Sequence, residues 1–217
     1  MVTSAIILAA GNGKRMGADI PKQFLAINGE YILTKTLRVF QESPEIQDIV
    51  LVTSGEWLDF CREEIVEKEG FSKVRHVITG GSERYDSVYA GLLACPNADF
   101  VFIHDGVRPY VSEEVLRRTA EEVLIAHAVA VGVPSKDTIK IVDGNGFVVE
   151  TPDRRNVWNV QTPQAFAYSL IRAAYEIVRE EGMTGITDDA MVVEASKLCK
   201  VKLVMGDYAN IKITTPD

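Results

Sequence analysis

Short runs of aliphatic and β-branched residues alternate along this chain with longer amphipathic stretches, and no other feature limits its fold as strongly. Most of the runs are continuous, which is typical of strands that helices cover on both faces. The pattern predicts repeated strand–helix units and an α/β fold with a mostly parallel sheet flanked by helices. The predicted strands are Ala5–Ala10, Ile49–Thr53, Val74–Ile78, Phe100–Ile103 and Ala128–Val133.

Capping residues and glycines mark helix boundaries between these runs. Ser54, Ser112 and Thr187 are of the type that caps a helix N-terminus, and acidic residues that favour a helix start follow the last two directly. Gly70 and Gly182 stand where a helix would end. The predicted helices run from Trp57 to Glu69, from Ser112 onward, from about Tyr168 to Glu181 and from Thr187 onward.

The size and charge of the chain narrow the classes of function. Its 217 residues, 47% of them apolar and 25% charged, suffice for one domain, residues 1–217, with a sizeable core. The net charge is −8, so general binding of nucleic acid is not expected, because such binding needs a basic surface. If the chain handles a polyanion such as a triphosphate, its few cations must lie together.

Neither a membrane span nor a secretory leader is predicted. The apolar run Ala5–Ala10 is too short to cross a bilayer, and no basic segment precedes it. The cysteines, Cys61, Cys95 and Cys199, are odd in number, far apart and without Cys-x-x-Cys spacing, which argues against a disulfide framework or a zinc site. A reducing compartment, and therefore the cytoplasm, is the predicted location.

One segment, residues 136–159, interrupts the rhythm of strands and helices. The run Asp143-Gly144-Asn145-Gly146 separates two β-like runs, Ile139–Val142 and Phe147–Glu150, and this pattern predicts a hairpin. A two-stranded ribbon is only marginally stable alone. We therefore expect a projecting arm that packs on something else, for which a second subunit is an obvious candidate.

The strongest signal for chemistry follows the first predicted strand. Gly11 and Gly13 allow close approach of the backbone to a ligand, and N–H groups in such a loop can surround phosphates. Three cations, Lys14, Arg15 and Lys22, lie within nine residues. The spacing fits neither Gly-x-Gly-x-x-Gly nor a Walker A loop. A plain turn with solvated basic residues is the simpler interpretation, but it needs neither the paired glycines nor three cations.

A second polar cluster, Gly80–Val88, lies between a predicted strand and a helix. Its glycines and short polar side chains, among them Gly81, Ser82 and Ser87, are suited to reading the edge of a base through backbone and hydroxyl hydrogen bonds. A loop with a helix cap explains the same residues without any ligand.

A third cluster, His104–Pro109, directly follows the predicted strand Phe100–Ile103. Ligands of open parallel sheets bind beyond the carboxyl ends of the strands. Asp105 is therefore placed to hold a metal ion or a hydroxyl, and Arg108 to bind a phosphate with two hydrogen bonds. An Asp–Arg pair in a turn can also be structural. His104, at a strand end, is more typical of a satisfied core or loop histidine than of a catalytic base.

The remaining candidates are scattered through the second half of the chain. Thr138 and Arg154 stand at either end of the predicted hairpin, and Thr162 lies in a Gln-Thr-Pro-Gln run. Thr187 is equally explained as a helix cap. Lys212, on a possible terminal strand, is placed either to meet a phosphate or to remain solvated.

In this combination and order, the segments resemble the 2-C-methyl-D-erythritol 4-phosphate cytidylyltransferases of the non-mevalonate isoprenoid pathway over nearly the whole chain. That resemblance implies a Rossmann-like nucleotidyltransferase fold and a homodimer joined by the hairpin arm. It rests on Ala9–Gly17, Pro21–Gln23, Gly80–Arg84 with Ser87 and Val88, His104–Pro109, Asp137–Lys140 with the preceding Lys136, Trp158 with Gln161–Phe166, Thr187–Ala190 and Asn210–Pro216.

The resemblance also implies roles. Arg15 and Lys22 would be the catalytic cations at the α-phosphate of CTP, and Mg²⁺, bound mainly through the CTP phosphates, would bridge those phosphates. The other implied contacts are to the triphosphate from Ala9, Ala10, Gly11, Asn12, Gly13 and Lys14; to cytosine and its ribose from Gly81, Ser82 and Ser87; and to the sugar phosphate from Asp105, Arg108, Thr162, Thr187 and Lys212, with Thr138 and Arg154 acting across the dimer.

The expected reaction transfers CMP from CTP to a small sugar-alcohol phosphate. The acceptor phosphate is already ionised near pH 7, so positioning and charge stabilisation would supply the catalysis. A pentitol phosphate such as ribitol 5-phosphate is the nearest alternative acceptor, although Asp137–Lys140 and Thr187–Ala190 look more like the methylerythritol enzymes. A nucleotide-binding module without catalysis is the alternative of another class, and the cations near Gly13 argue against it.

Two features depart from the family pattern. Two adjacent arginines, Arg154 and Arg155, follow the hairpin, and the spacing to Trp158 favours Arg154. Relatives usually continue beyond the point of Asp217 into a short terminal helix.

Overall fold

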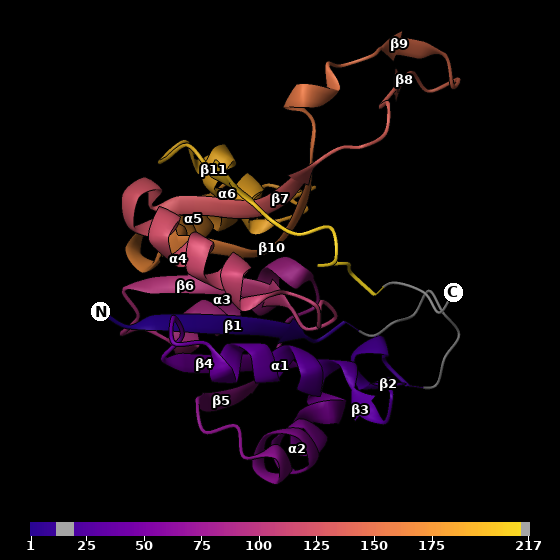
Figure 1. Cartoon of the computed structure of the whole chain (residues 1–217). Helices are drawn as coiled ribbons and strands as arrows, with labels where there is room; N and C mark the ends of the chain where they lie inside the picture. Colours follow the sequence, from indigo (N-terminus) through magenta and orange to yellow (C-terminus); the bar gives the residue numbers. More distant parts are fainter. Residues whose placement is uncertain (12–19, 214–217) are drawn as a thin grey trace.

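A computed structural model describes residues 1–11 and 20–213, and its centre is one sheet of seven strands (Figure 1). The strands lie side by side in the order β11-β7-β10-β6-β1-β4-β5. All five predicted strands are present, with boundaries that differ by no more than two residues. The strands are β1 (Thr3–Ala9), β4 (Asp48–Thr53), β5 (Val74–Thr79), β6 (Phe100–Asp105), β7 (Ala128–Pro134), β10 (Trp158–Ala167) and β11 (Lys202–Met205).

The sheet is mostly parallel, as predicted. Strand β1 pairs in parallel with β4 and β6, β4 with β5, and β7 with β11. Only β10 runs antiparallel, between β6 and β7. This strand was not predicted, and it contains Pro163, which has no N–H for a ladder. The strand accommodates the proline through a shift of register between Val160 and Gln164.

Two hydrophobic clusters show which helices cover each face of the sheet. In β1, Ala5 and Ile7 face one cluster and Ile6 faces the other, and all three side chains are fully buried. The strand reads as a continuous apolar run for this reason. One face is covered by α1 (Ile32–Glu42), the segment of α2 (Leu58–Phe60) with Cys61–Glu67, and α4 (Glu113–Ala126); the other by α3 (Arg84–Ala94), α5 (Tyr168–Glu180) and α6 (Asp189–Ser196).

Side-chain capping explains where two of the described helices, α4 and α6, begin. The Ser112 hydroxyl accepts the N–H of Val115 and caps α4, as predicted. Helix α6 begins later than predicted, because the carboxylate of Asp188, not Thr187, accepts the N–H of Met191. Ser54 makes no side-chain cap. The chain after it forms a 3₁₀ turn (Gly55–Trp57), then α2, then a π-helical stretch (Cys61–Glu67), where a regular α-helix was predicted.

The predicted hairpin is present and projects from the body as an arm (Figure 1). Strands β8 (Ile141–Val142) and β9 (Val148–Glu150) pair antiparallel, and a short turn (Arg154–Asn156) follows them. The Asp143 carboxylate closes the turn by accepting the N–H groups of Asn145 and Phe147. Apolar side chains on the arm are exposed, Phe147 to 72%.

The strand order creates a crevice beyond the carboxyl ends of two neighbouring strands, β1 and β6. From β1 the chain goes on to β4 and β5 on one side and then returns to place β6 on the other side. Such a reversal separates the loops that follow β1 and β6, and ligands of α/β sheets bind in the resulting crevice. Among the described helices, none is long and apolar enough to span a membrane.

Candidate active site

A cavity of about 690 Å³ opens at this reversal, beyond the carboxyl ends of β1 and β6. Its volume is in the range of pockets that hold small-molecule ligands. Residues from segments far apart in the sequence meet there, including the end of β1, the turn at Lys22, the Gly81 loop and the last described residues. The predicted site residues that line it are Ala9, Ala10, Gly11, Lys22, Gly81, Ser82, Ser87, Asp105 and Lys212.

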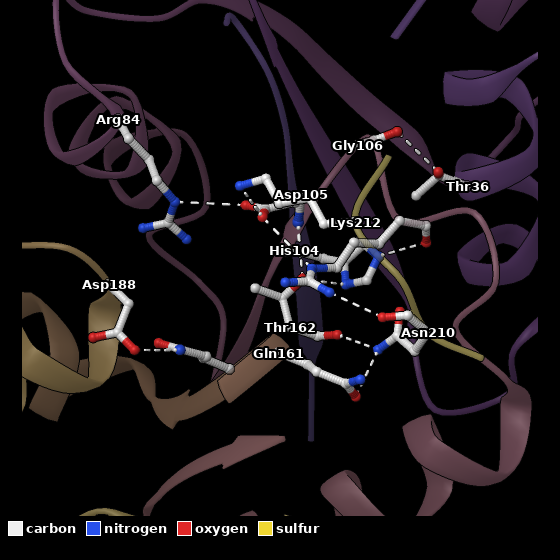
Figure 2. A network of polar contacts seen from close by, with 12 residues as sticks. Thr36, Arg84, His104, Asp105, Gly106, Gln161, Thr162, Asp188, Asn210 and Lys212 are labelled. Atoms are coloured by element: carbon white, nitrogen blue, oxygen red, sulfur yellow. Dashed lines mark hydrogen bonds and ion pairs between the residues drawn. The ribbon is translucent and has the colours of Figure 1, made fainter. Parts of the chain in front are cut away.

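The carboxylate of Asp105 is the electrostatic centre of the cavity (Figure 2). Lys212 Nζ lies 2.9 Å from its Oδ2, and Arg108 Nε lies 3.7 Å from the same oxygen. Arg84 Nε lies 3.5 Å from Oδ1. Burial by itself would raise the pKa of Asp105, but Arg84, Lys212 and Arg108 together hold this pKa well below its usual range. Asp105 is therefore ionised at any neutral pH.

Arg84, which the sequence did not single out, is itself held by a second carboxylate. Its guanidinium makes two hydrogen bonds to Asp189, at 3.1 and 2.7 Å. Asp189 is fully buried at the start of α6, and the Tyr175 hydroxyl donates to it at 2.7 Å. Burial works against the charged guanidinium, yet Asp189 and Asp105 raise the pKa of Arg84 above its ordinary value. A bidentate pair of this kind fixes the orientation of the arginine.

Beneath Asp105, Thr162 and His104 form a closed hydrogen-bonded unit (Figure 2). His104 Nε2 lies 3.1 Å from the carbonyl oxygen of Arg108, which can only accept, so Nε2 carries the proton. The neutral ring accepts at Nδ1 from the Thr162 hydroxyl, 2.9 Å away. That hydroxyl oxygen also accepts the N–H of Asp105, at 3.1 Å. The Thr162 hydroxyl is thus engaged inside the protein, and His104 is the satisfied core histidine that its position predicted.

The C-terminal segment is fastened over the sheet, and this places Lys212. The fully buried Asn210 donates from its side chain to the carbonyl of Thr162 at 2.8 Å, and its own carbonyl accepts from Arg108 at 2.9 Å. The Ile213 N–H donates to the carbonyl of Val107 at 3.0 Å. These bonds lie on both sides of Lys212. They explain how the segment 210–213, which is neither helix nor strand, delivers a lysine to the cavity.

The Gly80–Gly81 loop is shaped by the residues that follow it. The Ser87 hydroxyl accepts the Gly81 N–H at 3.2 Å and donates to the carbonyl of Glu83 at 3.2 Å. The Ser82 hydroxyl donates to Asp86 at 3.0 Å. A Cβ at Gly81 would lie 2.2 Å from the Cβ of Asp86, so this position has no room for a side chain. Ser87, on α3, therefore holds the loop in shape through these hydrogen bonds, in addition to lining the cavity.

The other predicted site residues are placed differently. Asn12, Gly13, Lys14 and Arg15 lie outside the described residues. Thr187 is exposed and is not among the described residues that line the cavity. Thr138 and Arg154 lie on the arm, also exposed and away from their own chain's cavity.

The residues that sequence reasoning missed are the ones that hold others in place. Arg84, Asp189 and Asn210 each stand inside a motif on which the resemblance rests, but no role was assigned to them. Motif membership was the only signal that could have found them, because partners 105 and 48 residues away in sequence supply their contacts.

Comparisons with known proteins agree with this arrangement. The family model described as 2-C-methyl-D-erythritol 4-phosphate cytidylyltransferase matches residues 3–217. The proteins of that name from Geobacter metallireducens and Geotalea uraniireducens are 48% and 50% identical to this chain, which they match over its full length and over 94% and 93% of their own. A solved 4-diphosphocytidyl-2C-methyl-D-erythritol synthase from Anaerococcus prevotii is 39% identical, with a TM-score of 0.87 over 99% of this chain and 91% of its own.

The chain belongs to the 2-C-methyl-D-erythritol 4-phosphate cytidylyltransferase family. It is therefore an enzyme of the nucleotidyltransferase class, with the Rossmann-like α/β fold that the solved relatives share. The expected family and fold are both confirmed.

The buried His104 predicts a specific dependence of stability on pH. Burial lowers the pKa of His104 to about 4 from an ordinary value of 6.5. Between these values the unfolded chain binds the proton more readily, so the free energy of unfolding should fall as the pH drops from about 6.5 to 4, by up to roughly 3 kcal/mol from this group. Urea unfolding of the wild-type chain and of His104→Gln between pH 6.5 and 4 isolates the contribution of His104 to the free energy of unfolding. Identical pH dependence in both proteins would contradict it.

Proposed function

We propose that this enzyme transfers CMP from CTP to 2-C-methyl-D-erythritol 4-phosphate and releases pyrophosphate. The observation that carries the proposal is the joining of two anion-binding regions in one cavity. The end of β1 and Lys22 form one region, and the cations around Asp105 form the other. A nucleotide triphosphate and a phosphorylated acceptor need such a pair of regions side by side. The names of the closely similar relatives support the choice of substrates.

The charges around Asp105 suit an acceptor that is both hydroxylated and phosphorylated. Asp189 balances Arg84, which leaves Lys212 and Arg108 facing a single carboxylate. The excess positive charge favours a phosphate group, and the Asp105 oxygens can accept from sugar hydroxyls. We assign this region to the acceptor and infer that it fixes the acceptor phosphate for attack on the α-phosphorus of CTP.

The chemical step itself needs no general base. The acceptor's phosphate oxygen is already ionised near pH 7 and attacks the α-phosphorus, while pyrophosphate leaves in line. Negative charge on the α-phosphoryl oxygens must be offset in the transition state. We assign this role to Lys22, which lines the cavity near the end of β1, and to Arg15, which follows the same loop in the sequence.

We propose that Mg²⁺ comes to the site on the phosphates of CTP. Among residues 1–11 and 20–213, no three His, Cys, Asp or Glu side chains are grouped to hold a metal ion. Two residues with carboxylates line the cavity, Glu83 and Asp105, and Asp105 is already surrounded by three cations. When bound, the ion would neutralise part of the triphosphate charge.

The direct test is pyrophosphate release from CTP with either 2-C-methyl-D-erythritol 4-phosphate or ribitol 5-phosphate as acceptor. We expect turnover with the methylerythritol phosphate in MgCl₂ and none after addition of EDTA. Turnover with ribitol 5-phosphate alone would move the enzyme to pentitol phosphates. No turnover with either acceptor would refute the proposal.

Lys22→Ala should lower kcat by roughly 10²–10³, the scale for the loss of one group that stabilises transition-state charge. Steady-state kinetics at saturating CTP and acceptor measure the effect. Lys35→Ala is the matched control and should leave kcat unchanged. Lys35 lies on α1, pairs with Glu30 and is not among the described residues that line the cavity. An unchanged kcat in Lys22→Ala would remove this residue from the mechanism.

We further propose that two chains associate through the arm and that the enzyme works in the cytoplasm. Five apolar side chains of the arm are 45% to 72% exposed, and an isolated ribbon gains stability by burying such a surface. All three cysteines are free, which suits a reducing compartment. In trans, Thr138 and Arg154 would then reach the acceptor region of the second cavity. Cell fractionation tests the compartment.

Gel filtration at micromolar concentration tests the association. We expect the wild-type chain to elute at twice its mass of 23.9 kDa and Phe147→Asp to elute as a monomer, because the charge would lie in the proposed interface. Wild-type elution at 23.9 kDa would refute both the dimer and the roles of Thr138 and Arg154.

A further inference from the structure

We propose that Gln23 is a positioning residue that holds the phosphate-binding loop at the end of β1 in its ligand-ready form. The inference rests on the proposed function and assigns a role to a residue that lies between the catalytic candidate Lys22 and the core. Gln23 is 4% exposed, at the edge of the cavity.

Both protons of the Gln23 amide are used by the loop. Its Nε2 donates to the carbonyl of Ala9 at 2.6 Å and to the carbonyl of Gly11 at 3.1 Å. These two carbonyls lie on either side of Ala10, in the part of the loop that lines the cavity. A primary amide has two N–H donors, so this nitrogen retains none for a ligand. Gln23 therefore acts through the loop.

The geometry of the peptide bond shows what the two hydrogen bonds achieve. In a trans peptide unit, the C=O and the following N–H point in opposite directions. Because the Ala9 carbonyl points to Gln23, the N–H of Ala10 points away from Gln23. A loop that binds phosphate must present N–H groups and turn its carbonyls away, since a carbonyl oxygen would repel the ligand. Gln23 holds two carbonyls in that turned-away state.

The support for Gln23 comes from below. It lies in a short 3₁₀ turn, Lys22–Phe24, in which the Phe24 N–H donates to the carbonyl of Pro21 at 2.9 Å. The Phe24 ring is buried and stacks on Trp57 at 4.5 Å between centroids, and Phe60 meets it edge-on at 5.3 Å. A turn anchored by such an aromatic cluster has little freedom to move.

The two hydrogen bonds from Gln23 to the carbonyls of Ala9 and Gly11, here called the clamp, have a second consequence because the same turn carries Lys22. The hydrogen bonds from Gln23 fix the separation between the lysine-bearing turn and the loop that follows β1. Both would contact the triphosphate, one by charge and one by backbone N–H groups. Misplacement of a reacting group by about 1 Å can cost about 10²-fold in rate. The clamp therefore sets the geometry of the CTP half of the cavity and leaves the acceptor half alone.

Gln23→Met tests the clamp, because methionine matches glutamine in length but cannot donate. The control is Gln47→Met, beside the opposite end of β1, where the glutamine is exposed and is not among the described residues that line the cavity. Gln47 also bridges two backbone groups, accepting from the Thr3 N–H at 2.8 Å and donating to the carbonyl of Pro44 at 3.1 Å. A purely structural role for Gln23 predicts that Gln23→Met, like Gln47→Met, changes Tm without a selective change in the KM for CTP.

We expect Gln23→Met to raise the KM for CTP about tenfold or more and to lower kcat/KM for CTP by about 10²-fold. The KM for the acceptor should stay within about threefold of the wild-type value. Gln47→Met should lower only Tm. Wild-type kinetics in Gln23→Met, or a parallel rise of both KM values, would overturn the proposal.

Gln23→Glu provides a second, isosteric test should the methionine variant fold poorly. Its carboxylate would face two carbonyl oxygens with no proton to donate, so affinity for CTP should fall further than in Gln23→Met. The loss should shrink at lower pH, where a protonated carboxyl can donate one hydrogen bond. An affinity equal to wild type at every pH would overturn the proposal.

Binding of CTP with MgCl₂, measured by calorimetry without any acceptor, separates this proposal from the proposed function. If the wild-type enzyme binds CTP but turns over neither acceptor, the function fails while the clamp is still tested by binding. A loss of CTP affinity of about tenfold in Gln23→Met supports the clamp in that case. Equal affinity in the two proteins refutes it.

Discussion

The ionised carboxylate of Asp105 is the constraint on which the site depends. It is buried at the end of β6, where an isolated charge would be costly, and three cations from separate parts of the chain compensate it. Arg84 comes from α3, Arg108 from the loop after β6, and Lys212 from the C-terminal segment. The ion pairs with Asp105 therefore hold these three elements together beyond the carboxyl end of β6. The same attraction that satisfies Asp105 assembles the half of the cavity that we propose for the acceptor.

Most of the sheet could be predicted because its strands carry their own signal. A strand covered on both faces must be apolar throughout, and most of the five predicted runs show this pattern. The exception is Val74–Ile78, which contains Arg75 and His76 and forms β5 at the edge of the sheet. Strand β10 could not be found in this way. Its pairing with β6 and β7 overrides the proline within it, and such tertiary support has no trace in a local pattern. A helix was predicted over Cys61–Glu67, but its π-helical form was not, since the sequence has an ordinary helical composition.

The sequence allowed us to predict which residues come to the cavity better than it allowed us to predict their contacts. Motifs singled out Asp105, Lys22 and Gly81, and all three line the cavity. What a hydroxyl or amide does there depends on partners far away in sequence. Thr162 was expected to face the acceptor, but its hydroxyl joins His104 to the Asp105 backbone. A sequence names the polar groups of a site but does not say which of them the protein uses for itself.

This division between groups that face the ligand and groups that hold them explains how so acidic a chain can bind two polyanions. Its net charge is −8, yet three cations gather around Asp105, and two of them have a second partner that fixes their direction. Arg84 is oriented by Asp189 and Arg108 by the carbonyl of Asn210. On the side that we propose for CTP, neutral backbone N–H groups would supplement the cations, provided that the loop carbonyls are turned away. A buried glutamine can do this without adding charge, whereas a lysine or arginine at the same position would carry a charge into a nearly closed environment.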